Sequence, residues 1–216
     1  MNILALEGAL GCFSCALIAG RREFTEQLEA KVALERGLTL VQALLHRAEL
    51  SPHELHRVAV GCGPGSFTGL RIALSYAKSL AQGWRLPLVA VSSFDVLEGD
   101  VTQTPLLTVV TPRTGVISAR LRDRLGERRA SGLVSQALEQ LLDGFPERSI
   151  GVINASKDVL AALGERAMDV HILPCPPPPP ALSLARMARR EVPAISSHSV
   201  RADYGELPAA IVRGLP

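Results

Sequence analysis

The sequence predicts an α/β fold in two lobes that join near residue 100. Three short strand-like runs separated by glycine-containing turns open the chain and predict a strand meander. Strand-like and helix-like segments then alternate, as in proteins with mixed sheets flanked by helices. The alternation of strand-like and helix-like segments changes near residue 103, where two strand-like segments follow one another. We therefore divide the chain into a first lobe at 1–103 and a smaller second lobe at 104–216, from which the tail is free to return to the first lobe.

Apolar periodicity and turn residues define the elements of the first lobe. Strands are expected at 2–7, 12–18, 22–29, 56–62 and 87–91. Val41, Leu44, Leu45 and Ala48 have helical spacing and predict a helix at 38–50. A second helix runs from the glycine-rich segment to about residue 82, and Ser92 or Ser93 caps a third, short helix.

The second lobe shows the same alternation. Two strands, at 104–112 and 114–123, are expected to meet at a turn around Pro112–Gly115. The remaining predicted elements are an amphipathic helix at 133–145, a strand at 149–154 and helices at 156–164 and 181–190. The run of prolines at 174–180 is stiff polyproline II and serves either as a spacer or as a ligand for a proline-reading domain, with the spacer favoured.

Composition narrows the class of protein. The chain has 216 residues, 47% hydrophobic and 20% charged, with a net charge of +2, so no strong attraction to nucleic acid is expected. No apolar run approaches the ~20 residues of a membrane helix. The apolar start lacks a basic segment and contains Glu7, so we interpret it as paired strands and not as a signal peptide. A cytoplasmic protein without a membrane partner is expected.

Four cysteines, Cys12, Cys15, Cys62 and Cys175, raise the question of a metal or redox site. Cys12 and Cys15 form a C-x-x-C pair, but a zinc site needs a second pair, which the chain lacks. A redox dithiol would stand at the start of a helix, whereas these two lie in an alternating strand. A structural role is therefore favoured.

The segment GCGPGSFTGLRIA, at 61–73, is the most distinctive motif. A P-loop needs Lys and Ser/Thr where Leu70 and Arg71 stand, and the dinucleotide pattern needs a third glycine where Ser66 stands. A general anion site at a helix start stays open, with Gly63, Gly65 and Ser66 as candidates.

Ser66 is also tested as a nucleophile. A serine elbow needs glycines at the positions of Pro64 and Thr68, so an N-cap role for Ser66 is favoured and no catalytic residue is proposed. His53 and His56 flank a turn without a carboxylate set, and we expect no metal site.

The helix after this motif is apolar on two sides. One stripe contains Leu70, Ala73, Leu74, Ala77 and Ala81, and its small residues would let another helix approach closely. Burial against the sheet and contact with a partner are both compatible with this pattern.

Several segments together resemble one family. The run from VAVGCGPGSFTGLRI through AKSLA to PLVAVSS closely resembles the TsaB (YeaZ) family, a non-catalytic subunit in bacterial tRNA threonylcarbamoyladenosine synthesis. The opening ILALEGALGCFSCALI, the turn TPRTGVISARL and the terminal ADYGELP are similar to other parts of that family. The resemblance is strong from Met1 to about Leu97 and weak beyond.

The resemblance implies the two-lobed actin/Hsp70-like (ribonuclease H-like) fold and a scaffold role without chemistry of its own. It implies a TsaD-like catalytic partner, a TsaE-like ATPase recruited through the complex, a homodimer when the chain is alone, and indirect contact with tRNA. No cofactor is expected, with nucleotide binding only in the complex. The partner face it implies lies on two helices of the first lobe: Leu40, Leu44, Leu70, Ala73, Leu74, Ala77 and Ala81.

The sequence departs from this family in three places. Glu7-Gly8 stands where the superfamily has Asp-Thr, Thr111-Pro112-Arg113 stands where Asp-Ala-Arg is usual, and the arginine common near the C-terminal tyrosine is missing after Tyr204. The missing first acid and the missing metal ligands argue against the alternative function, a nucleotide-dependent phosphotransferase or a peptidase-like enzyme of the same superfamily. A further open point is an arginine strip, which is either a basic patch or a solvated edge, the edge being favoured: Arg120, Arg122, Arg124, Arg128 and Arg129.

Overall fold

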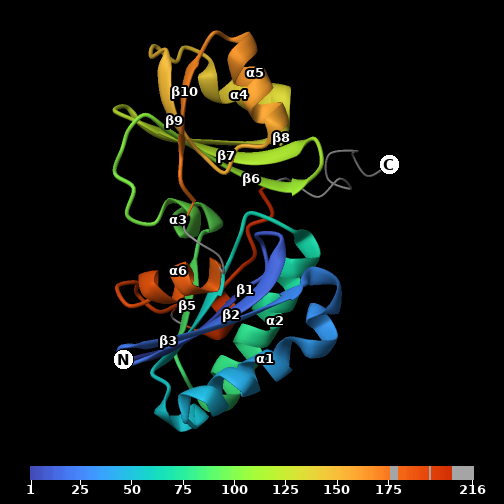
Figure 1. Cartoon of the computed structure of the whole chain (residues 1–216), viewed down its shortest axis with the longest axis vertical. Coiled ribbons are helices and arrows are strands. Elements are labelled where there is room, and N and C mark those ends of the chain that lie inside the picture. The colour runs from blue at the N-terminus through green and yellow to red at the C-terminus, as the bar shows by residue number, and fades with distance from the viewer. Residues whose placement is uncertain (176–179, 195, 206–216) are drawn as a thin grey trace.

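The computed structural model describes residues 1–175, 180–194 and 196–205, and Figure 1 shows them in two lobes. Each lobe is built on a five-stranded sheet. The strand order is β3-β2-β1-β4-β5 in the first lobe and β10-β9-β6-β7-β8 in the second. Parallel and antiparallel pairs occur in both sheets, so the predicted α/β fold with mixed sheets flanked by helices is confirmed.

The first lobe begins with an antiparallel meander and continues with parallel strands. Its strands are β1 Asn2–Glu7, β2 Cys12–Ala19, β3 Arg22–Glu29, β4 Arg57–Gly61 and β5 Leu88–Val91. Its helices are α1 Ala33–Ala48, α2 Phe67–Trp84, α3 Ser93–Glu98 and, from far along the chain, α6 Pro180–Met187.

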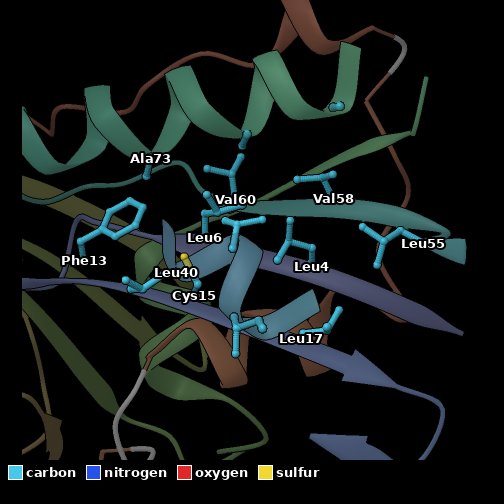
Figure 2. Close-up of a cluster of buried hydrophobic side chains, with 14 of the residues drawn as sticks. Leu4, Leu6, Phe13, Cys15, Leu17, Leu40, Leu55, Val58, Val60 and Ala73 are labelled. Atoms are coloured by element: carbon cyan, nitrogen blue, oxygen red, sulfur yellow. The ribbon is translucent and has the colours of Figure 1, made fainter. Parts of the chain in front are cut away.

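Alternation along the strands decides which helices cover which face of this sheet. Leu4 and Leu6 of β1 join the apolar cluster formed with α1 and α2, which Figure 2 shows. Ile3 and Ala5 point to the opposite face and pack with residues of α6. Because successive side chains of a strand point to opposite faces, the nearly continuous apolar run of β1 fits a sheet buried on both sides.

The second lobe places two helices on one face of its sheet. Its strands are β6 Leu106–Arg113, β7 Val116–Asp123, β8 Gly126–Leu133, β9 Ser149–Ile153 and β10 Asp169–Leu173. Its helices are α4 Val134–Leu142 and α5 Lys157–Glu165. Leu107 and Val109 of β6 pack with these helices, while Leu106 and Val110 turn toward α3.

After the second sheet, the chain returns to the first lobe. α6 packs on β1 and β2. Farther on, the backbone N–H of Ala194 donates to the carbonyl oxygen of Leu88 at 2.8 Å, at the edge strand β5. Within the described residues, α6 and this edge contact therefore belong to the first lobe, a return that the division at 104–216 allows for the tail.

Several boundaries differ from the predicted ones. The sequence pattern does not predict β8 or β10, and α1 begins at Ala33 and not at Leu38. Most of the proline run at 174–180 and the last part of ADYGELP lie outside the described residues. Among the residues that the structure does describe, no helix is long and apolar enough to cross a membrane.

Candidate functional site

The glycine-rich motif forms a tight turn between β4 and α2. The hydroxyl of Ser66 accepts a hydrogen bond from the backbone N–H of Gly69 at 3.3 Å, and the N–H of Ser66 donates to the carbonyl oxygen of Ala9 at 2.9 Å. The predicted N-cap role of Ser66 is therefore confirmed. The second hydrogen bond ties this turn to the turn between β1 and β2.

The start of α2 lies in direct backbone contact with that neighbouring turn. A Cβ on Gly69 would lie 1.8 Å from the carbonyl oxygen of Gly8, and a Cβ on Gly8 would lie 2.4 Å from the carbonyl oxygen of Gly69. Glycine at both positions lets the two backbones approach this closely. The motif thus sets how α2 sits on the sheet.

The same packing argues against an anion site at Gly63, Gly65 and Ser66. A Cβ on Gly63 would lie 2.1 Å from the carbonyl oxygen of Asp203, and one on Gly65 would lie 2.4 Å from that of Ala9. Both glycines are buried. The loop is therefore packed against acceptor oxygens of its own chain, which repel an anion instead of binding it.

The seven residues predicted for the partner face lie inside the first lobe. All are buried, from fully enclosed to 8% exposed: Leu40, Leu44, Leu70, Ala73, Leu74, Ala77 and Ala81. Figure 2 shows Ala73 of α2 and Leu40 of α1 among side chains of the sheet. Their apolar stripe therefore packs on the sheet of its own lobe and leaves almost no surface of these side chains for a partner.

The exposed side of the helix pair carries different residues. Leu34 is 68% exposed and Leu38 is 42% exposed, and they stand one helical turn apart on α1. We call these two residues the leucine face. Because α1 begins before the predicted start, Leu34 falls outside the predicted helix; its spacing from Leu38 is the signal that identifies this second stripe.

Tyr76 of α2 holds the leucine face in place. Its hydroxyl donates to the carbonyl oxygen of Ala33 at 3.3 Å and also to that of Leu34. A Cβ on Gly37 would lie 2.5 Å from Cε2 of Tyr76, so glycine at 37 lets this ring pass close to α1. The two helices therefore present one fixed surface.

A cationic and aromatic cluster marks the start of α2. The guanidinium of Arg71 stands 3.8 Å from the ring centroid of Phe67, and the rings of Phe67 and Tyr204 are 4.9 Å apart. Arg71 Nε also donates to the Tyr204 hydroxyl at 3.4 Å. The tyrosine of the terminal motif thus anchors the returning chain on α2.

Glu7 occupies the end of β1, directly before the turn that leads to β2. Its side chain is fully buried and accepts hydrogen bonds from the backbone N–H groups of Ala9, at 2.7 Å, and Leu10, at 3.2 Å. Burial raises the pKa of Glu7 to about 7, although these backbone hydrogen bonds act in the opposite direction. Glu7 therefore supports the turn after β1 from within.

We expect this burial to make stability depend on pH. Because the folded pKa lies above the unfolded value of 4.5, Glu7 costs stability as pH rises from 4.5 through 7, by about 2–3 kcal/mol between pH 5 and pH 8. Glu7→Gln should remove this part of the decline, measured by urea denaturation at each pH. The exposed variant Glu35→Gln is the control, and profiles of equal slope for Glu7→Gln and the wild type would refute the expectation.

A cavity of about 440 Å³ lies between the lobes. Ala9, Leu10 and Gly11 line it from the first lobe, and Thr111, Asn154 and Ser156 line it from the second. Among the described residues that line it, none carries a charge. Glu7 lies beneath the Ala9–Leu10 turn and does not line the cavity.

The arginine strip is largely neutralised within the chain. Arg120 and Arg122 bind Glu98 at 2.8 and 2.7 Å. Arg128 binds Asp123 at 2.9 Å, and Arg129 binds Glu127 at 2.6 Å. Each of these four residues has a carboxylate partner, and the strip runs from the buried Arg120 to Arg129, which lies on a solvated edge.

The cysteines are free thiols, and His56 bonds to the backbone of its own lobe. Cys12, Cys15, Cys62 and Cys175 are free thiols, and burial raises the pKa of each, to about 11 for Cys62. His56 Nδ1 accepts a hydrogen bond from the backbone N–H of Asn2 at 2.9 Å. Within the described parts of the chain, no three His, Cys, Asp or Glu side chains are grouped to hold a metal ion.

The comparisons with known proteins agree with this architecture. The model of a protein family described as "TsaD: tRNA N6-adenosine threonylcarbamoyltransferase" matches residues 28–148. The chain thus belongs to this TsaD-type class. In structure it is similar to YeaZ from Pseudomonas aeruginosa, with a TM-score of 0.70 and 21% identity over 94% of this chain and 99% of that one. EutJ from Carboxydothermus hydrogenoformans shares the fold at a TM-score of 0.50, with 11% identity over 86% of this chain and 88% of that one.

Curated relatives narrow the class. TsaB of Bacillus subtilis is 35% identical over 45% of this chain and 43% of its own length. TsaB of Escherichia coli is 37% identical over 43% of this chain and 41% of its own length. These matches thus span less than half of each relative. Within the TsaD-type class, these relatives support the TsaB (YeaZ) family. The solved structures show the fold, and the two-lobed actin-like fold that the resemblance implies is confirmed.

Proposed function

We propose that the chain is a non-catalytic subunit that binds a TsaD-like threonylcarbamoyltransferase and supports threonylcarbamoyladenosine modification of tRNA. Two of its relatives are named tRNA threonylcarbamoyladenosine biosynthesis protein TsaB, and the matching family model carries the name of the transferase. The observation that carries the proposal is the exposed leucine face on a fixed pair of helices.

The leucine face suits a partner that is itself helical. Leu34 and Leu38 lie one turn apart on α1, and the Tyr76 ring, tucked against Gly37, holds α2 alongside. Such a two-helix surface packs on another pair of helices by interdigitation of side chains. When a partner covers these exposed leucines, their apolar surface is removed from water, and this burial favours binding.

The chemistry in this proposal belongs to the partner. Ser66 is engaged as a helix cap, and Glu7 is enclosed beneath a turn. The raised pKa of Cys62 keeps this thiol out of the reactive thiolate form. We propose that a TsaE-like ATPase joins through the complex, that tRNA contact is indirect, and that any nucleotide binds only in the complex. When alone in the cytoplasm, the chain would form a homodimer through the leucine face.

The test measures binding of the chain to a purified TsaD-like protein. Leu34→Glu and Leu38→Glu each place a charge on the leucine face and should weaken the complex tenfold or more, at about 1.4 kcal/mol per tenfold. The matched control is Leu125→Glu, because Leu125 is 86% exposed on the other lobe. Titration calorimetry and co-elution provide the readouts.

Each outcome has a distinct meaning. Failure of the wild-type chain to bind would refute the proposed function, whereas wild-type affinity in both face variants would refute only the leucine face. A strain lacking the gene should lose threonylcarbamoyladenosine, and Leu125→Glu should restore it better than Leu34→Glu. Nucleotide or peptide hydrolysis by the isolated chain, abolished by Ser66→Ala or Glu7→Ala, would support the enzyme alternative instead.

A further inference from the structure

The two lobes meet across α3, which lies between the sheets in Figure 1. Phe94 and Leu97 of α3 form an apolar cluster with Leu106, Val110 and Ile153 of the second sheet. Apolar burial supplies adhesion, but it is non-directional. This cluster alone would allow the lobes to settle at more than one angle.

A buried carboxylate at the end of α3 adds direction. The side chains of Glu98 and Arg120 are each 5% exposed. Glu98 Oε1 accepts hydrogen bonds from Thr108 Oγ1 at 2.6 Å and Arg120 Nε at 2.9 Å, while Arg122 Nη2 stands 2.7 Å from Oε2. Both oxygens of a first-lobe carboxylate are therefore held by side chains of β6 and β7.

The guanidinium of Arg120 makes the reciprocal connection. Its Nη2 lies 2.7 Å from Asp95 Oδ1 on α3, and its centre lies 5.1 Å from the ring centroid of Phe94. Burial opposes the charge of Arg120, but Asp95 and Glu98 outweigh burial and keep its pKa above the ordinary value. Arg120 is thus a charged side chain of the second lobe that is enclosed by the first.

We propose that this junction network, defined as Asp95, Glu98, Thr108, Arg120 and Arg122, fixes the angle between the two lobes. Replacing buried ion pairs with apolar residues is often neutral for stability, whereas leaving one buried charge without a partner is strongly unfavourable. A different lobe angle would separate Glu98 from Arg120 while the apolar cluster still encloses both. The network therefore selects one orientation, and the apolar cluster provides the adhesion.

The returning chain lies against the same junction. The backbone N–H of Asp203 donates to the carbonyl oxygen of Cys62 in the first lobe at 2.7 Å. Two residues later, a Cβ on Gly205 would lie 2.1 Å from Ser118 Oγ on β7. This second bridge limits opening, and between 196 and 205 it shows no ion pair that joins the lobes, so we assign the choice of angle to the junction network.

The experiment measures lobe orientation in the full chain by residual dipolar couplings. In the wild type, one alignment tensor should fit the amide couplings of both lobes. The triple variant Glu98→Leu/Thr108→Val/Arg120→Met keeps the junction apolar and removes its two buried charges and the hydroxyl, while the more exposed Asp95 and Arg122 stay in place. It should remain folded but lose the common tensor, with the two lobes fitting tensors of different magnitude. The control Arg128→Gln, which removes a cation paired with Asp123 inside the second lobe, should keep the common tensor.

Two results would overturn the proposal. The first is a wild-type chain whose lobes already align independently. The second is a triple variant that retains the common tensor at the wild-type angle. Couplings within each lobe report whether that lobe is folded; if the triple variant unfolds, Glu98→Gln replaces it, with the same expected loss of the common tensor.

Discussion

Gly69→Ala is expected to lower the free energy of unfolding by about 3 kcal/mol. The added Cβ would lie 1.8 Å from the carbonyl oxygen of Gly8, and the group that it meets is backbone and not a flexible side chain. To relieve this clash, α2 must move away from the turn after β1. This movement opens the core between the helix and the sheet. Urea denaturation followed by the fluorescence of Trp84, the single tryptophan, measures the change.

Gly83→Ala is the matched control for this prediction. Gly83 lies in the same helix, and a Cβ there would meet nothing within 4 Å. Alanine favours the helical conformation over glycine, so this variant should gain about 0.5 kcal/mol. Equal effects of the two substitutions would show that the close approach at Gly69 does not matter.

Leu44→Ala should cost about 2–5 kcal/mol of stability, whereas Leu34→Ala should stay within about 0.5 kcal/mol of the wild type. Both leucines belong to α1, but Leu44 is fully enclosed in the core and Leu34 is mostly exposed. A large loss at Leu44 follows from lost burial together with the cavity left behind.

The same pair of variants separates core from interface. Leu34→Ala should weaken partner binding at nearly unchanged stability, and Leu44→Ala should lower stability with little effect on the affinity of the folded fraction. Thermal unfolding and calorimetric titration of each variant provide the two measurements. The opposite pattern would return Leu44 to the partner face and remove Leu34 from it.

Local patterns identify most of the fold. Nearly continuous apolar runs mark β1 and β2, and serines at positions 66, 92 and 156 each cap the expected helix. The pattern does not reveal β8 and β10 because both are edge strands, in which at most one residue is buried. The charged β8 lacks the apolar alternation of a half-buried strand, and in β10 the alternation covers only a few residues.

The candidate site is harder to predict because exposure is a property of the assembled lobe. The spacing of Leu70, Ala73 and Ala77 identifies a face of α2 but does not say whether a sheet or a partner covers it. The tertiary fold decides this, since the sheet takes that stripe and leaves Leu34 and Leu38 outside. The close approach of Gly8 and Gly69 is likewise invisible in a single sequence, because the two residues are far apart along the chain.

The position of α6 has a consequence for synthesis on the ribosome. One face of the first sheet, with Ile3 and Ala16, is covered by a helix that begins at Pro180. The strands of the second sheet, from Leu106 to Leu173, emerge before that helix does. During synthesis, one apolar face of the first sheet therefore stays uncovered until α6 emerges, at a time when all strands of the second sheet are already available. We expect a nascent chain that is halted before Pro180 to expose this face and to bind chaperones that recognise apolar surface.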